Sequence, residues 1–263
     1  MKKYIIIGLV LLFSGCADQL DLAPQQSVDQ DLALSTDANV KRVLQGAYSE
    51  IRSTSLYGGS LLLYAEMLGA NREVRWEGTF NQPREMFNKN ILVNNSFVQG
   101  SWSDAYKAIN VANNVLASLE VVDSEDQERV EGEALFIRGS MFFELVKFFA
   151  LPYSAGSVDS NLGVPLVLTP TRQIDEDSYV ARNTVAEVYA QIISDLEKAE
   201  VQLPAVNGFL ARNYVVAAQL SRVFLQMGDY EKARDAADRA ISISSANGKI
   251  LTLNYLDAFN TDG

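Results

Sequence analysis

The most reactive side chain in this sequence is its single cysteine, Cys16, which follows a short apolar stretch. Two lysines stand after the initiating methionine, residues 4–13 are mostly aliphatic, and a serine and a glycine precede the thiol. A positive start, a short apolar core and small residues at its end are typical of a secretory signal, and this apolar stretch is too short to span a bilayer as a helix. The sequence therefore predicts that residues 1–15 are removed during export.

The place of Cys16, at the expected cleavage point, resembles a bacterial lipoprotein signal. In such a signal the thiol is acylated, and several acyl chains at ~0.8 kcal/mol per buried CH2 give lasting membrane attachment. The alternative is an incidental cysteine in an ordinary cleaved signal, although the rest of the chain offers no disulfide partner. We expect Cys16 to be lipidated and residues 16–34 to form a tether and an extended lead-in.

The residue types that are missing exclude several kinds of chemistry. The sequence has no histidine, which removes Ser-His-Asp and Cys-His catalysis, and its lone cysteine cannot build a zinc site. A glycosidase that uses two carboxylates stays possible, but no paired carboxylate motif is evident. The formal net charge of −11 argues against nucleic acid as a partner. We therefore expect no catalytic residues, no metal and no cofactor.

Helical periodicity dominates the remainder of the chain. Thr184 and Glu187 have the spacing of a capping box, which marks a helix start. Further helices are expected after Ser35 and, as a short one, over residues 61–68. Strand signals are weak, so the sequence predicts an all-α fold. The longest predicted helices cover residues 102–121, 125–149, 184–200, 213–227 and 230–244.

The last two predicted helices resemble a tetratricopeptide repeat, a helical hairpin with a glycine in its turn. Gly228 and Asp229 form that turn. An ordinary helical hairpin is the alternative. Because one repeat cannot bury its apolar face alone, several must stack, which predicts tetratricopeptide-like helical hairpins with long irregular loops. The second helix carries small residues that we expect to face the preceding helix: Ala233, Ala237 and Ala240.

Polar and aromatic residues on the predicted helices have structural interpretations. Arg138 lies on an apolar helix, where we expect a buried ion pair with Glu133 or Glu144, since a buried charge needs a partner to offset its desolvation. The residues expected in core and cap positions are Trp102, Tyr106 and Asn113.

An ordered set of sequence blocks resembles the SusD/RagB lipoproteins of Bacteroidetes. The blocks are 46–48, 102–113 (WSDAYKAINVAN), 132–138, 142–146, 163–167, 182–199 and 227–230, after the lipoprotein-like start. The resemblance implies a SusD-like helical domain over residues 35–263. Because members of that family are longer, we expect this domain to be truncated at its C-terminus.

The resemblance also implies a function. A protein of this family would be lipid-anchored in the outer membrane at the cell surface, where it captures a nutrient, most simply an oligosaccharide and otherwise a peptide. It would deliver that ligand to a SusC-like TonB-dependent β-barrel without catalysis. A tetratricopeptide-type envelope scaffold and a lipid-anchored glycosidase are the alternatives. Since part of the family's ligand site would come from the missing half, we expect this chain alone to bind glycan weakly or not at all.

Residues 69–100 supply the candidate ligand site. They show no clear period, and long irregular segments inside compact domains are often functional. Sugars are usually held by aromatic faces together with planar polar groups. Trp76 has an alternative role as an anchor for the loop. The candidate ligand-binding residues are Asn71, Arg72, Arg75, Trp76 and Phe80.

Overall fold

The computed structural model describes residues 30–252, apart from 72, 174 and 250. The predicted signal, the tether up to residue 29 and Cys16 lie outside these residues. Within them, every regular element is a helix, and one isolated bridge joins Leu162 to Thr184. The prediction of an all-α fold is confirmed.

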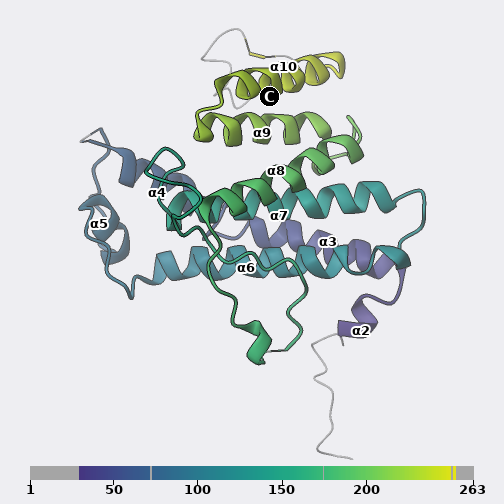
Figure 1. Ribbon diagram of the computed structural model, residues 1–263, viewed down its shortest axis with the longest axis horizontal. Coiled ribbons are helices and arrows are strands. Elements are labelled where there is room, and N and C mark those ends of the chain that lie inside the picture. Colours follow the sequence, from purple (N-terminus) through teal and green to yellow (C-terminus); the bar gives the residue numbers. More distant parts are fainter. Residues whose placement is uncertain (1–29, 72, 174, 250, 253–263) are drawn as a thin grey trace, which may run out of the picture.

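The long helices stack side by side in chain order from α6 to α10, and α3 packs against α6 and α7 (Figure 1). The long helices are α3 (Asp37–Ile51), α6 (Ser96–Leu116), α7 (Gln127–Phe149), α8 (Val185–Gln202), α9 (Asn213–Met227) and α10 (Tyr230–Ala246). The short elements are α2 (Gln30–Ala33), α4 (Ser60–Gly69), α5 (Asn81–Phe87) and the 3-10 turns η2 (Leu119–Val121) and η3 (Glu176–Ser178).

Residues 30–33, which were expected to be part of an extended lead-in, form helix α2. The predicted boundaries of the long helices agree with the structure except around α6. This helix begins at Ser96, well before the predicted start at residue 102, because the Asn95 side chain caps it. Asn95 Oδ1 accepts hydrogen bonds from the N–H groups of Phe97 and Val98, at 3.1 and 3.2 Å. An asparagine at this position satisfies backbone donors that have no partner inside the helix. The helix also ends earlier than predicted, since residues 119–121 form a 3-10 turn.

The caps of the C-terminal helices are confirmed. The N–H of Glu187 donates to Thr184 Oγ1 at 3.2 Å, and the N–H of Thr184 donates to Glu187 Oε2 at 2.8 Å, which is the reciprocal pattern of a capping box. Gly228 ends α9 in the left-handed region, with φ of 79°, and Asp229 caps α10. A residue with a side chain would be strained at Gly228, so the turn selects glycine.

The small-residue face of α10 differs from the prediction. Ala233 and Ala236 are the buried alanines of α10, whereas Ala237 and Ala240 are half-buried. The hydroxyl of Ser221 donates to the Ala233 carbonyl at 2.8 Å, which shows how closely α9 and α10 approach there. The burial of α10 is therefore deepest at Ala233 and Ala236, and the predicted stripe omitted Ala236.

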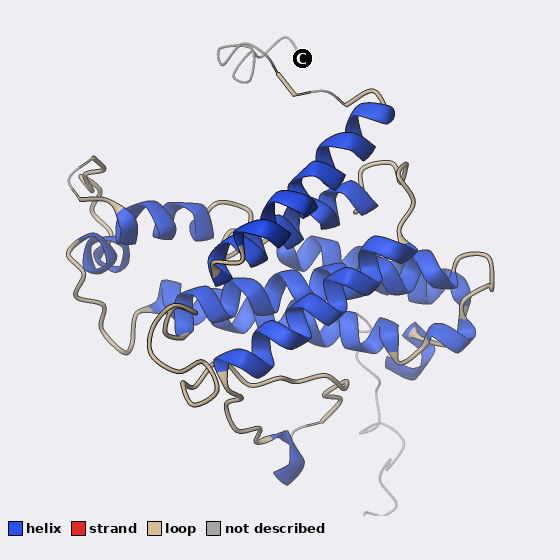
Figure 2. Ribbon diagram, turned by 45° about the horizontal axis from the view of Figure 1, so that its top comes forward, coloured by secondary structure: helices blue, strands red, loops and turns tan. Residues whose placement is uncertain are grey.

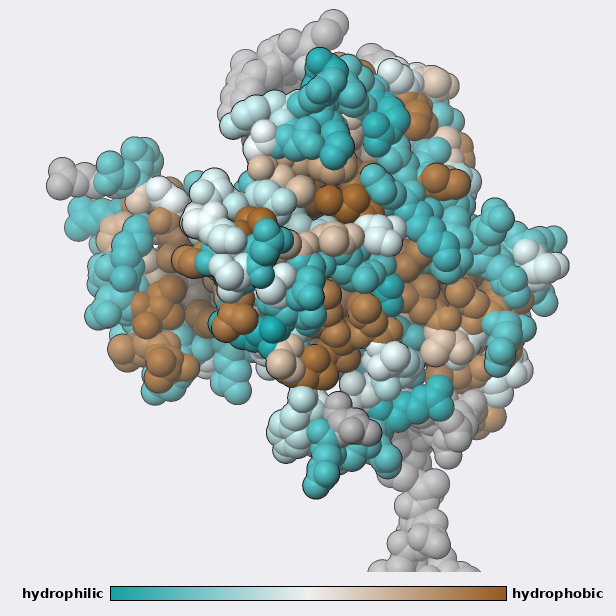
Figure 3. Space-filling view, in the orientation of Figure 1, coloured by the Kyte–Doolittle hydropathy of each residue, from teal (hydrophilic) through white to brown (hydrophobic). Residues whose placement is uncertain are grey.

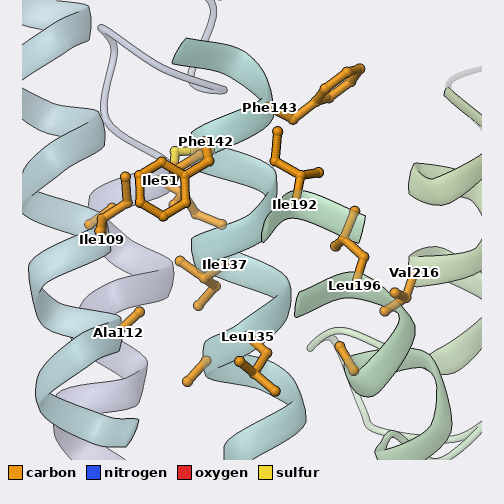
Figure 4. Close-up of a cluster of buried hydrophobic side chains, with 14 of the residues drawn as sticks. Ile51, Ile109, Ala112, Leu135, Ile137, Phe142, Phe143, Ile192, Leu196 and Val216 are labelled. Atoms are coloured by element: carbon orange, nitrogen blue, oxygen red, sulfur yellow. The ribbon is translucent and has the colours of Figure 1, made fainter. Parts of the chain in front are cut away.

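The hydrophobic core lies on both sides of α7, whose residues from Val130 to Val146 are mostly buried. A helix buried around its whole circumference belongs at the centre of a bundle. Gly139 allows α8 to approach, since a Cβ there would lie 3.1 Å from Leu196 Cγ. Figure 4 shows side chains from neighbouring helices pointing toward one another in this core: Ile109, Ile137, Phe142, Ile192, Leu196 and Val216.

The buried partner of Arg138 is Asp195 on α8, and not Glu133 or Glu144. The guanidinium donates through Nε to Asp195 Oδ2 at 2.8 Å and through Nη2 to Oδ1 at 2.7 Å. Glu133 instead pairs with Arg129, and Glu144 with Lys147. The prediction of a buried ion pair was right in kind and wrong in partner, because Arg138 points across the helix interface and not along its own helix.

The loop between α7 and α8 is fastened to α6 by the polar residues of the 102–113 block. Tyr106 Oη donates to the Pro165 carbonyl at 2.8 Å, and Asn113 Nδ2 donates to the Val167 carbonyl at 2.8 Å. Asn113 is buried and also accepts a hydrogen bond from Arg138 Nη1 at 3.0 Å. This long loop runs over the outside of the bundle in Figure 2, so these contacts fix its course.

Candidate ligand-binding site

Residues 60–98 form a small unit at one end of the bundle, which we call the α4–α5 unit. Tyr64, Met67 and Met86 make an apolar cluster separate from the main core, and Trp76 and Phe97 pack against it. The prediction that residues 69–100 are irregular throughout was wrong at α5 and at the start of α6. Pro83 lies in the first turn of α5, where a helix tolerates proline because that N–H has no helical partner.

Trp76 and Phe80 lie close together in this unit but in different environments. The indole Nε1–H of Trp76 donates to the Phe80 carbonyl at 3.2 Å, and the half-buried ring leaves no room for a side chain at Gly78. The Phe80 side chain is 63% exposed, with its ring centroid 6.3 Å from that of Phe97. Trp76 therefore holds the loop in place, and Phe80 presents an aromatic face to solvent.

The polar candidates Asn71 and Arg75 precede this aromatic pair in the same loop. The Asn71 backbone N–H donates to Glu73 Oε2 at 2.6 Å. The backbone N–H of Glu73 itself, and then that of Asn71, lower the pKa of the Glu73 carboxyl. Arg75 pairs with Glu77 at 2.6 Å, and its side chain stays 79% exposed. An exposed ion pair of this kind contributes little stability, so the Arg75 guanidinium is available to a ligand. Arg72 lies outside the described residues.

Sequence reasoning did not identify the apolar character of this end of the molecule. A cavity of about 110 Å³ lies beside α4, with Tyr64, Met86 and Phe148 among its lining. Figure 3 shows apolar side chains gathered at the left, over α4 and α5. Three successive leucines in α4 give a usable signal, because one helix face cannot bury all three. The exposed apolar side chains of the α4–α5 unit include Leu62, Leu63, Ile91, Leu92 and Val93.

The arrangement suits reversible binding. The unit offers an exposed aromatic ring, a guanidinium and amide groups, which are the kinds of group that protein sites use for the faces and hydroxyls of sugars. Across the described residues, no group of three or more histidine, cysteine, aspartate or glutamate side chains is placed to hold a metal ion. The same part of the chain contains no helix of the length and apolar character needed to cross a membrane.

The chain matches known proteins over most of its length. A family described as "Starch-binding associating with outer membrane" matches residues 18–225. SusD-like protein P2 of Formosa agariphila is 28% identical over 249 residues, covering 92% of this chain and 46% of that protein.

Solved structures agree with this match. A putative sugar binding protein from Bacteroides vulgatus is 28% identical with a TM-score of 0.70, over 81% of this chain and 48% of that one. A SusD superfamily protein from Bacteroides thetaiotaomicron is 28% identical with a TM-score of 0.69, over 85% and 49%. This chain thus spans about half the length of these relatives. The matched family is described by binding and not by catalysis, and the chain belongs to it: it is a member of the SusD-like family.

Proposed function

We propose that this chain is part of a lipoprotein that captures an oligosaccharide at the outer membrane and delivers it to a SusC-like TonB-dependent β-barrel. The family description, starch-binding associating with the outer membrane, supports both the ligand class and the location. The name of the similar Bacteroides vulgatus structure, a putative sugar binding protein, supports the ligand class again. Delivery to the barrel rests on the resemblance to the family alone.

The observation that carries the proposed site is the exposed ring of Phe80 on a loop that Trp76 anchors. A sugar stacks on the Phe80 face, while Arg75, Arg72 and Asn71 offer hydrogen bonds to its hydroxyls. Because the Trp76 indole already donates to the Phe80 carbonyl, its role is to position Phe80. A ring held in place before binding loses less conformational freedom when the ligand arrives.

We expect Phe80→Ala to weaken oligosaccharide binding by about tenfold, the loss of one stacking contact. The thermal midpoint should stay unchanged because the ring is largely exposed. The measurement is an NMR titration of the ¹⁵N-labelled chain with millimolar maltooligosaccharides and other neutral oligosaccharides. Tyr179→Ala is the matched control, since this aromatic side chain is 83% exposed and lies on the long loop. Equal affinities for Phe80→Ala and the wild type would contradict the proposed site.

We also propose that Cys16 carries the lipid that attaches the protein to the outer membrane. Cys16→Ser removes the only thiol in the sequence, so the variant cannot be acylated there. We expect the variant to leave the membrane fraction and to lack the mass increase of the acylated wild type, which fractionation and mass spectrometry would measure. A variant that stays membrane-bound with the wild-type mass increase would refute lipidation at Cys16.

A further inference from the structure

A second hollow, which we call the α3 pocket, lies between α3 and the loop that joins α8 to α9. It encloses about 540 Å³ and shares no lining residue with the α4–α5 unit. Its wall combines aromatic rings with polar side chains of several kinds. The lining residues that matter here are Gln45, Tyr48, Ser49, Arg52, Asn207 and Phe209.

The loop side of the α3 pocket is held by buried hydrogen bonds. Asn207 Nδ2 donates to Glu133 Oε1 at 3.0 Å and to the Ala211 carbonyl at 2.8 Å. The Ala211 N–H in turn donates to Tyr48 Oη at 3.0 Å. Burial, and then the neighbouring Glu133 carboxylate, raise the pKa of Tyr48 above its usual range, so the phenol stays protonated. The loop is therefore fixed to both α3 and α7.

Phe209 is fully exposed although it belongs to this fixed loop. Gly208 adopts a left-handed conformation, with φ of 54°, in the turn that presents the ring. Large aromatic side chains usually bury most of their surface, and one exposed beside a hollow, on a loop whose backbone is fixed, is typical of a binding surface. The ring supplies an apolar face at the mouth of the α3 pocket.

Arg52 gives the α3 pocket a positive charge. Among the described side chains that line it, Arg52 alone is charged, and its guanidinium makes no ion pair or hydrogen bond within the described part of the chain. Arg52 is exposed, so its guanidinium is open to a ligand that enters the α3 pocket. A planar guanidinium binds a carboxylate through two parallel charge-assisted hydrogen bonds, which are stronger than the hydrogen bonds that it makes to the hydroxyls of a neutral sugar.

We propose that the α3 pocket is a second carbohydrate subsite, and that it selects a uronic acid residue. The uronate carboxylate binds Arg52, the sugar ring stacks on Phe209, and Gln45 and Ser49 hydrogen-bond to its hydroxyls. This inference rests on the proposed function of carbohydrate capture and specifies that the captured carbohydrate is acidic. The described lining of the α3 pocket includes no carboxylate, and the nearby Glu133 is paired with Arg129, which explains how an acidic protein can bind an acidic sugar there.

The test is an NMR titration of the full 263-residue ¹⁵N-labelled chain with trigalacturonate and with its neutral counterpart, galactotriose. We expect trigalacturonate to shift the amide signals of residues 49 and 207–210, and galactotriose to bind there at least about tenfold more weakly, as the loss of a charged hydrogen-bond pair predicts. Added salt should weaken the trigalacturonate affinity, because the carboxylate contact is exposed.

Two variants test the assigned contacts. We expect Arg52→Gln and Phe209→Ala each to weaken trigalacturonate binding about tenfold, with Arg52→Lys intermediate because lysine keeps the charge without the planar fork. Arg234→Gln and Tyr230→Ala are matched controls, since both side chains are exposed on α10, and neither should change the affinity. Thermal midpoints should stay at the wild-type value throughout.

The possible failures separate this inference from the proposed function. Equal binding of the two trisaccharides, or trigalacturonate binding that Arg52→Gln leaves unchanged, would overturn the proposal that the α3 pocket selects a uronate. The proposal would also fail if the chain did not bind trigalacturonate but self-associated in a way that Phe209→Ala abolished. The Phe209 ring would then be a protein contact. Neutral oligosaccharide binding that depends on Phe80 would survive all of these results, and its loss would instead count against the proposed function.

Discussion

Asp195→Ala should lower the free energy of unfolding by about 3–5 kcal/mol, because it leaves the Arg138 guanidinium buried without its counter-charge. The side chains of Arg138 and Asp195 are only 10% and 3% exposed, so water cannot replace the lost carboxylate without opening the interface between α7 and α8. Asn113 Oδ1 would be the one hydrogen-bond acceptor left to the guanidinium within the described residues.

Equilibrium urea unfolding of the wild type and the variant measures this effect. Asp235→Ala is the matched control, because Asp235 also pairs with an arginine at 2.6 Å but both side chains are at least half exposed. We expect that control to change stability by less than about 1 kcal/mol. The double variant Arg138→Met with Asp195→Leu should recover most of the loss, since apolar residues of similar size need no partner.

A loss below about 1 kcal/mol for Asp195→Ala would show that the guanidinium finds another partner or water. The loss of stability in Asp195→Ala would then be no larger than in the exposed control Asp235→Ala, which would contradict the burial of the ion pair. The loop between α7 and α8 gives a second readout. Because Asn113 holds both Arg138 and the Val167 carbonyl, its amide signals and those of the loop should shift in the variant.

The helices of this protein follow from local sequence because their signals are local. Thr184 and Glu187 are three residues apart, and the Gly228-Asp229 turn is set by two neighbouring residues, so both could be predicted from spacing alone. The start of α6 was missed because the Asn95 cap stands among glycine and asparagine residues that also favour loops. The same residues are compatible with a loop and with a helix start, and in the structure Phe97, in the first turn of α6, packs against Tyr64 and Phe80.

Contacts between distant residues could not be predicted in this way. Arg138 and Asp195 are 57 residues apart, and the sequence around Arg138 offers closer acidic residues on the same helix. Only the packing of α7 on α8 decides between these partners. In the candidate site, the sequence placed Trp76 and Phe80 in one segment, but the bond from the indole to the Phe80 carbonyl depends on the fold of the loop. For the same reason Phe209 gave no signal, since it stands beside Arg52 only in three dimensions.

The packing of α10 on α9 provides the second large effect on stability. We expect Ala236→Leu to lower the free energy of unfolding by about 1–3 kcal/mol, because added methylene groups in a filled interface force side chains or backbone to move. Ala236 is fully buried. Near it, the hydrogen bond of Ser221 to the Ala233 carbonyl keeps the two helices close, so the interface cannot widen without breaking it.

Ala240→Leu is the matched control, because Ala240 is half-buried on the same helix and a leucine there can extend into solvent. We expect this control to cost less than about 1 kcal/mol, and the difference between the two variants removes the shared change in helix propensity. Equilibrium urea unfolding of both variants gives the comparison. If Ala240→Leu cost more than Ala236→Leu, Ala240 and not Ala236 would lie at the tightest part of the interface with α9. A larger cost at Ala236 instead supports the interface seen in the structure, with Ala233 and Ala236 at its centre.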